Sequence, residues 1–363
     1  SDQTDSSFFV GIREYGSPSS FIDVRHKGGK LFPATPDKVH VEKLDARRLA
    51  VQFKNMAPTT FVAPRIEFTT VHSTSVQSVD VSPSGRLVVS SDSNGQLVVW
   101  HADTAEIIRN FVGHALDVNR CRFFPSGLVV LSAGMDMSVR IWSVETGQCP
   151  RVLKGHRQGV VDLGIIDRGK EILSCSKDGT AKMWNCGSAE CLRTWCPEAG
   201  LVNAIAVTPS SSAENISGVF SVACEMGKAK VYDIRSSEPG ATISIDKEEG
   251  TSVAFGTSEG ANLYIGTAGG SVISYDMKAG KTFAKLKTSR GAVTKLCVRE
   301  SLGLFSSFYD GTVSCYDLPL NSKMAKLEFS GADCDPVYDM STAAEGQLYT
   351  ACRDRIVRKY SVA

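Results

Sequence analysis

Residues 113–142 read "GHALDVNRCRFFPSGLVVLSAGMDMSVRIW". This stretch contains His114, Ser132 and Asp136, which are the residue types of a nucleophilic triad. Two interpretations follow, because these side chains form either the active site of a hydrolase or a structural chain of hydrogen bonds. The rest of the sequence decides between the two, since the same residue types recur at a fixed spacing.

The recurrence has a period of 42 residues and extends over three consecutive segments. Four positions keep this period, and they are occupied by His72, Ser90, Asn94 and Trp100, by His114, Ser132, Asp136 and Trp142, and by His156, Ser174, Asp178 and Trp184. Three catalytic triads at one fixed period in one chain are implausible, whereas structural repeats have this regularity. We therefore predict that the constellation is architectural.

The spacing resembles that of the WD-repeat family of β-propellers, in which each repeat of about 40–45 residues forms a four-stranded blade. The segments "KGHRQGV" (154–160) and "SCSKDGTAKMW" (174–184) carry the match. The resemblance implies that the tryptophan indole donates to the serine, the serine bonds the histidine, and the histidine bonds the turn aspartate. Such a buried polar chain is favourable only when every member has its partner. No catalytic residue and no cofactor are therefore expected.

Four further repeats are degenerate, and each is recognised by an aromatic residue near the end of its third strand. These residues are Tyr232, Tyr275, Tyr316 and Tyr360. With the three regular repeats, they predict an all-β fold, a seven-bladed WD-repeat β-propeller over 59–363. Residues from about 61–70 are expected to supply the outer strand that closes the ring. Residues 1–58 do not fit the repeat and are predicted to form a small β-rich N-terminal domain.

Composition narrows the classes of function. A net charge of +1 provides no general attraction to nucleic acid or to an anionic membrane, and the apolar runs are too short to span a bilayer. Eleven cysteines without a CxxC pair indicate reduced thiols rather than a disulfide framework. Cys186, Cys191 and Cys196 are evenly spaced, but we interpret them as strand positions and not as a metal site.

Loops on one face of such a propeller carry the histidines and the turn aspartates, and partners are expected there. The predicted partner-binding residues are Asp117, Asn119, Glu248, Glu249, Tyr309, Asp333, Asp335, Tyr338 and Arg353. The most distinctive segment is "SGADCDPVYDM" (330–340), which holds three carboxylates, those of Asp333, Asp335 and Asp339. Two interpretations of it stay open: a solvated turn, or an acidic contact for a basic partner.

Three stretches also resemble a narrower family. The sequences "CRFFPSGLVVLSAGMD", "IIDRGKEILSCSKDGTAKMWNCG" and "GADCDPVYD…YTACRDRIVRKY" are similar to the family of proteasomal ATPase-associated factors. This resemblance implies an assembly chaperone and negative regulator of the 26S proteasome in the cytoplasm and nucleus. It would bind the C-terminal domains of ATPase subunits of the 19S regulatory particle, without enzymatic activity or cofactor, and we expect a monomer.

Two other functions remain as alternatives. "VYDIR" (231–235) resembles the Trp-Asp-x-Arg motif through which substrate receptors of cullin ubiquitin ligases contact their adaptor, with Tyr232 in place of tryptophan. A reader of basic peptides such as histone tails is the second alternative, because an acidic face would hold a basic tail. Nucleic acid is disfavoured, since no stripe of Lys and Arg with interleaved aromatic residues is present.

Overall fold

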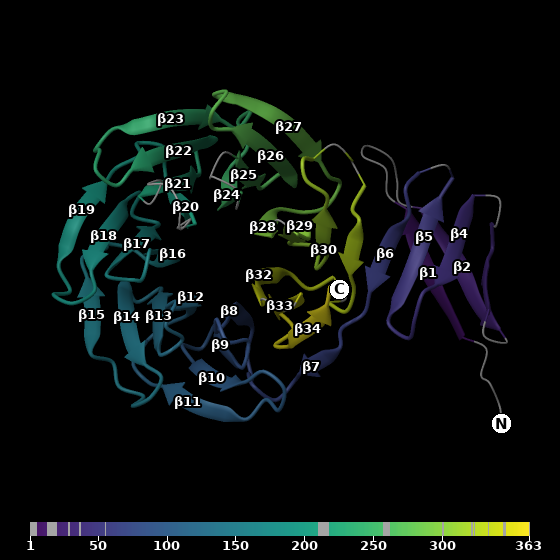
Figure 1. The fold of residues 1–363 in the computed structure, drawn as a ribbon, viewed down its shortest axis with the longest axis horizontal. Helices are drawn as coiled ribbons and strands as arrows, with labels where there is room; N and C mark the ends of the chain where they lie inside the picture. The colour runs from purple at the N-terminus through teal and green to yellow at the C-terminus, as the bar shows by residue number, and fades with distance from the viewer. Residues whose placement is uncertain are drawn as a thin grey trace.

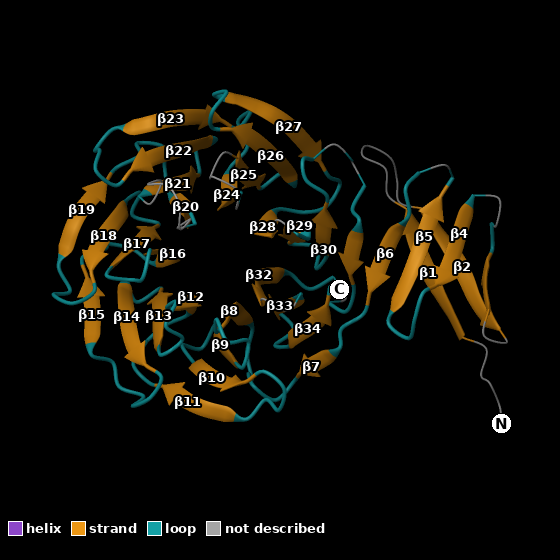
Figure 2. Cartoon of the chain, viewed as in Figure 1, coloured by secondary structure: helices purple, strands orange, loops and turns teal. Residues whose placement is uncertain are grey.

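A computed structural model gives the fold. It describes residues 6–12, 20–27, 30–35, 38–54, 56–209, 218–256, 262–299, 301–320, 322, 324–332, 334–343 and 346–362. Throughout these ranges the chain consists of β-strands and connecting loops (Figure 2). In the same ranges, no helix has the length and apolar character that crossing a membrane requires.

Six sheets of four strands each stand around a central opening (Figure 1). In the first five, the chain runs from the innermost strand to the outermost strand. Their strands are β8 (Val76–Val81), β9 (Leu87–Asp92), β10 (Leu97–His101) and β11 (Ile107–Phe111); β12 (Val118–Phe123), β13 (Val129–Gly134), β14 (Ser138–Ser143) and β15 (Arg151–Lys154); β16 (Val160–Ile166), β17 (Glu171–Ser176), β18 (Ala181–Asn185) and β19 (Cys191–Trp195); β20 (Val202–Val207), β21 (Val219–Cys224), β22 (Lys228–Asp233) and β23 (Pro239–Ser244); and β24 (Gly250–Phe255), β25 (Asn262–Thr267), β26 (Ser271–Asp276) and β27 (Lys281–Lys287).

The sixth four-stranded sheet joins the two ends of the ring. It contains β32 (Val337–Ala343), β33 (Gln347–Cys352), β34 (Val357–Ser361) and β7 (Ile66–Phe68). Strand β7 pairs antiparallel with β34, so a segment before the first repeat supplies the outer strand of the last one. The predicted closing segment, 61–70, is thus divided, because its first two residues belong to β6 (Thr59–Val62), which lies in another sheet.

The prediction of a seven-bladed propeller is wrong as stated, because the described residues form six four-stranded blades. The remaining strands of the ring, β28 (Val293–Arg299), β29 (Gly303–Phe308), β30 (Val313–Tyr316) and β31 (Leu327–Phe329), belong to a seven-stranded sheet. There β31 pairs in parallel with β6, and the sheet continues into β5 (Arg48–Phe53) and β4 (Val39–Lys43). An aromatic residue that ends a third strand marks a repeat, but it does not report what pairs with the fourth strand.

The described residues among the first 53 form a small β-rich region beside the ring (Figure 1). A three-stranded sheet contains β1 (Ser6–Ile12), β2 (Ser20–Lys27) and β3 (Lys30–Pro33). It packs against β4 through a core that includes Ile22, Val24, Val39 and Val41. The region is attached to the ring by continuous strand pairing from β4 to β31, and not by a linker alone.

The innermost strands around the opening share one irregularity. In β8, β12, β16, β20, β24, β28 and β32 the pairing register shifts after the first residue, as a β-bulge does. The next paired residue is therefore at an equivalent position on each strand, and these residues are Ser78, Arg120, Asp162, Ala204, Ser252, Lys295 and Asp339. Side chains at these equivalent positions therefore differ in charge and polarity from one sheet to the next.

Candidate partner-binding surface

The His114 constellation forms a continuous chain of hydrogen bonds. The Trp142 indole Nε1 lies 2.8 Å from Ser132 Oγ, and Oγ lies 2.7 Å from His114 Nε2. His114 Nδ1 lies 2.9 Å from Asp136 Oδ2. An indole N–H can only donate, so Oγ accepts from it and gives its own hydrogen to Nε2. The imidazole then carries its proton on Nδ1 and donates it to Asp136.

The other two regular repeats form the same chain of hydrogen bonds, but in one of them a predicted member is wrong. His156 contacts Ser174 and Asp178 at 2.8 and 2.9 Å, respectively. In the first repeat, however, the predicted member Asn94 does not contact His72. Asp92 Oδ2 lies 3.1 Å from His72 Nδ1, while Asp92 Oδ1 accepts the backbone N–H of Asn94 at 2.9 Å. Here the carboxylate is supplied two residues earlier, from the end of β9, and Asn94 only occupies the turn.

These serines are not placed to act as nucleophiles. Ser90, Ser132 and Ser174 are all fully buried. Each hydroxyl accepts from a tryptophan and contacts a histidine, so it is fixed in the sheet rather than presented to a substrate. Burial raises the pKa of Asp136, but hydrogen bonds from His114 and Ser138 outweigh it and hold the carboxyl ionised. The geometry supports the architectural interpretation.

In two of the repeats that end in tyrosine, an arginine pairs with the turn aspartate. Arg358 Nη2 contacts Asp354 Oδ2, and its Nε lies 3.0 Å from Glu67 Oε1 on β7. Arg290 lies 3.8 Å from Asp310 Oδ2 and pairs more closely with Glu328 on β31. The sequence analysis did not identify either arginine, because neither occupies the position of the histidine.

The structure brings four predicted site residues together beside the last two inner strands. We call Tyr309, Asp335, Tyr338 and Arg353 the Arg353 cluster. Arg353 Nε and Nη2 lie 2.8 and 2.7 Å from Asp335 Oδ1, and Tyr309 is 51% exposed. Burial raises the pKa of Tyr338, and the neighbouring Tyr309 adds to the rise. Tyr309 and Arg353 each precede a turn aspartate, so the cluster lies on the face that carries the histidine loops.

Close backbone packing holds this cluster in place. Gly311, in the turn after Tyr309, has a φ of +86°, and a Cβ there would lie 2.8 Å from the carbonyl oxygen of Asp335. The N–H of Arg353 also donates to the carbonyl of Pro336 at 3.0 Å. The two turns and the 334–336 segment thus form one rigid support, on which the side chains of Tyr309 and Arg353 reach solvent.

The expected acidity of segment 330–340 is lower in the structure than its three carboxylates indicate. Asp333 lies outside the described residues. Asp335 forms the ion pair with Arg353, so its charge is largely balanced. Asp339 is not on this surface at all, because it is fully buried in the central opening beside Arg120 and Arg122. The bulge at the start of β32 turns Asp339 inward, and a single segment of sequence does not reveal that direction.

Glu248 and Glu249 lie in the loop between β23 and β24 and take part in local bonds. Glu248 accepts a hydrogen bond from the Thr267 hydroxyl, and its carboxylate fills the space beside Gly269. Gly269 stands where other repeats have the turn aspartate, so Glu248 replaces that missing carboxylate. Glu249 Oε1 accepts from Asn203 Nδ2 at 2.8 Å. Among the described residues, no hydrogen bond or ion pair connects either glutamate to the Arg353 cluster.

Asp117 and Asn119 lie at the start of β12, elsewhere on the ring (Figure 1). Asn119 Nδ2 donates to the carbonyl of Val160 at 2.8 Å and so ties β12 to the neighbouring inner strand β16. Asp117 is half-buried, and its backbone carbonyl accepts from Met135. The structure therefore does not merge these two residues with the Arg353 cluster into one patch.

The residues behind the alternative interpretations are also placed. Tyr232 of "VYDIR" is buried and stacks on Phe220, while Asp233 and Arg235 are exposed. Of the three evenly spaced cysteines, Cys191 and Cys196 are exposed and Cys186 is half-buried. Within the described ranges no group of three or more histidine, cysteine, aspartate or glutamate side chains is arranged to hold a metal ion.

Comparison with known proteins agrees with this geometry. The family described as "WD domain, G-beta repeat" matches residues 65–101, 105–143 and 147–185, which are the three regular repeats. Proteasomal ATPase-associated factor 1 from Bos taurus is 41% identical over 325 residues, which cover 85% of this chain and 81% of that protein. The Homo sapiens protein of the same name is 40% identical over 327 residues, with the same coverage. The chain therefore belongs to the family of proteasomal ATPase-associated factor 1.

Proposed function

We propose that this protein is a non-catalytic scaffold that binds ATPase subunits of the proteasomal 19S regulatory particle. In this proposal it holds their C-terminal domains, acts as an assembly chaperone and negative regulator of the 26S proteasome, and works as a monomer in the cytoplasm and nucleus. The observation that carries the proposal is the 40–41% identity, over 81% of their length, to relatives named for association with proteasomal ATPases.

The Arg353 cluster is the contact that we assign to the ATPase. Tyrosine and arginine are enriched among the residues that dominate binding energy at protein interfaces. Here Tyr309 and Arg353 are each about half exposed, on a support fixed by Gly311 and by the Asp335 ion pair. A rigid aromatic group beside an oriented guanidinium offers apolar contact and hydrogen bonds at a small entropic cost. Carboxylates on the partner would complement the free donors of Arg353.

The test is a binding titration of the full chain against the isolated C-terminal domain of each proteasomal ATPase subunit. We expect selective binding to at least one domain, and Tyr309→Ala should weaken it by about tenfold or more, as the loss of an interface anchor does. Phe283→Ala is the matched control, because Phe283 is 54% exposed on the outer strand β27, away from the cluster.

Two comparators make the titration decisive. A cullin-ligase adaptor and a basic histone-tail peptide are titrated under the same conditions. Binding to the adaptor alone, lost in Arg235→Ala, would replace the proposal with the ligase function. Binding to the basic peptide alone would identify a peptide reader, and equal effects of Tyr309→Ala and Phe283→Ala would move the ATPase contact away from the Arg353 cluster.

A further inference from the structure

The central opening of the ring contains a cavity of about 540 Å³. The cavity is lined by residues from the inner strands β8, β12, β20, β24, β28 and β32 and from the ends of those strands. Its volume is in the range of small-molecule sites, roughly 300–1,000 Å³. None of the residues assigned to the ATPase contact lines it.

One end of the cavity is closed by ion pairs that cross the opening. Lys295 Nζ on β28 lies 3.3 Å from Asp162 Oδ2 on β16, although these strands belong to sheets that are not neighbours in the ring. Arg120 lies between the two buried carboxylates, 2.8 Å from Asp162 and 2.7 Å from Asp339. Arg122 completes the group at 3.0 Å from Asp339. The result is a pocket bounded at one end by charged side chains.

The charges around this pocket are not balanced. Arg120, Arg122 and Lys295 face the two carboxylates of Asp162 and Asp339. A third carboxyl, that of the half-buried Asp80, accepts hydrogen bonds from the Phe123 N–H and the Ser341 hydroxyl, each at 2.8 Å. Burial raises the pKa of Asp80, and the nearby Arg122 opposes this rise. We call these six residues, Asp80, Arg120, Arg122, Asp162, Lys295 and Asp339, the channel cluster.

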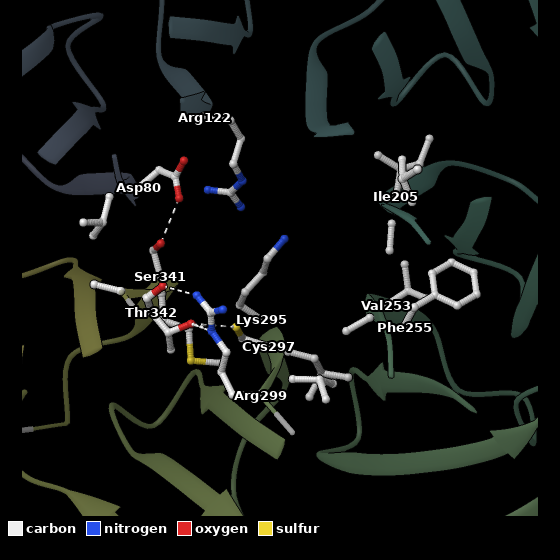
Figure 3. A pocket seen from close by; sticks show the side chains of 18 of the residues that line it. Asp80, Arg122, Ile205, Val253, Phe255, Lys295, Cys297, Arg299, Ser341 and Thr342 are labelled. Carbon is white, nitrogen blue, oxygen red and sulfur yellow. Dashed lines mark hydrogen bonds between the residues drawn. The ribbon is translucent and has the colours of Figure 1, made fainter. Parts of the chain in front are cut away.

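Arg299 adds a further cation on the same wall. Its guanidinium donates to the hydroxyl and to the carbonyl oxygen of Thr342 (Figure 3). Among the described residues, no carboxylate lies within ion-pair distance of it. Burial and the nearby Arg120 lower the pKa of Lys295, and an anion beside the ammonium would oppose that effect. Four cationic side chains thus share three carboxyl groups.

The opposite wall is apolar. Ile205, Val253 and Phe255 lie across the pocket from the charged side chains (Figure 3). Side-chain differences around the ring accompany this asymmetry, because β20 and β24 carry alanine and serine at the position where β12, β16, β28 and β32 carry arginine, aspartate or lysine. A pocket with a cationic wall and an apolar wall fits a ligand that has an anionic head and a compact apolar body.

We propose that this pocket binds a small organic anion, with its charged head between Lys295 and Arg299 and its apolar body against Phe255. The head is a phosphate or carboxylate, because guanidinium and ammonium groups pair with both. The site is independent of the ATPase contact, so either proposal can fail without the other.

The experiment is calorimetric titration of the full chain with three probes. They are phenyl phosphate, which has head and body, inorganic phosphate, which has the head only, and benzyl alcohol, which has the body only. We expect phenyl phosphate to bind about tenfold more tightly than inorganic phosphate and benzyl alcohol not to bind. Equal affinity for phenyl phosphate and benzyl alcohol, equal affinity for the two phosphates, or no binding up to about 10 mM phenyl phosphate would overturn the proposal.

Arg299→Gln locates the site. Within the described ranges its guanidinium bonds only the neutral Thr342, so glutamine keeps donors there and leaves no described carboxylate unpaired. We expect phenyl phosphate affinity to fall about tenfold, while Arg353→Gln, which removes an exposed arginine outside the pocket, leaves it unchanged. An equal loss in the two variants would assign the binding to non-specific surface charge. If Arg299→Gln did not fold, the three-probe comparison on the unchanged protein would still decide.

Discussion

The histidine repeats and the channel cluster are both buried polar networks, yet they are built in opposite ways. Each histidine network lies within one sheet, uses neutral donors together with a single aspartate, and repeats every 42 residues. The channel cluster joins different sheets, uses full charges of both signs, and has different residues at equivalent positions. The first network therefore stabilises each blade, whereas the second fixes how blades are placed across the opening.

The largest expected effect follows from breaking the channel cluster. Asp339→Asn would leave Arg120 and Arg122 buried with one fewer countercharge, and removing one partner of a buried ion pair costs about 3–5 kcal/mol. We expect the free energy of unfolding in urea to fall by that amount. Hydrogen bonds and charge from Arg120 and Arg122 overcome burial and keep the pKa of Asp339 far below its usual value. The stability that the Asp339 carboxylate contributes is therefore present at every pH above the pKa of an aspartate in the unfolded chain. It is lost only in strong acid, as the pH falls toward the pKa of Asp339 in the folded protein.

Asp335→Asn is the control for this change, because it also removes an aspartate from an arginine pair, but on the surface. Arg353 and Asp335 are both accessible to solvent, and exposed pairs contribute roughly 0–1 kcal/mol. If the two variants lost similar stability, the channel cluster would not carry the role that its burial implies, and the contrast between the two networks would fail.

A smaller effect is expected from the histidine network. Ser132→Ala removes the hydroxyl that accepts from Trp142 and donates to His114, so two buried polar groups lose a partner. At about 1–3 kcal/mol for a stranded group, we expect a loss of roughly 2–4 kcal/mol in the same urea titration. Ser188→Ala, at an exposed serine, should be nearly neutral. Preserved stability together with loss of a measurable turnover would instead restore the hydrolase interpretation.

The two networks also differ in how far the sequence predicts them. The spacing of Trp142, Ser132 and His114 is local and repeated, and the resemblance to WD repeats that it carries implied their bonds. Asp92 was missed because the carboxylate comes from the last residue of β9, two residues before Asn94, where the repeat predicts it. Asp162 and Lys295 are 133 residues apart, and only closure of the ring brings them together. The 42-residue period of the sequence does not predict such a pair.

The number of blades was predicted wrongly for the same reason, because strand pairing between distant parts of the chain does not follow from the repeat. Tyr316 correctly marks a repeat, but the pairing of β31 with β6 depends on where the N-terminal strands fold. Tyr309 and Arg353 were named from the sequence because each precedes a turn aspartate, and Asp335 and Tyr338 because they belong to segment 330–340. That these residues bind a partner stays a prediction. The low acidity of this surface was not predicted. It depends on the Asp335–Arg353 ion pair and on the burial of Asp339, and both arise only when the chain folds.

The smallest expected effect is a pH dependence that belongs to one histidine network. Burial lowers the pKa of His156, and the contact with Asp178 opposes this without reversing it. The folded protein then binds fewer protons than the unfolded chain as the pH falls below about 6.5, so stability decreases there and is recovered at higher pH. His156→Gln should flatten this slope between about pH 7.5 and pH 5.5. Asp339 contributes no such slope, because its pKa lies far below this window. A flattened slope in Asp339→Asn together with an unchanged slope in His156→Gln would therefore contradict the assignment of this proton to His156.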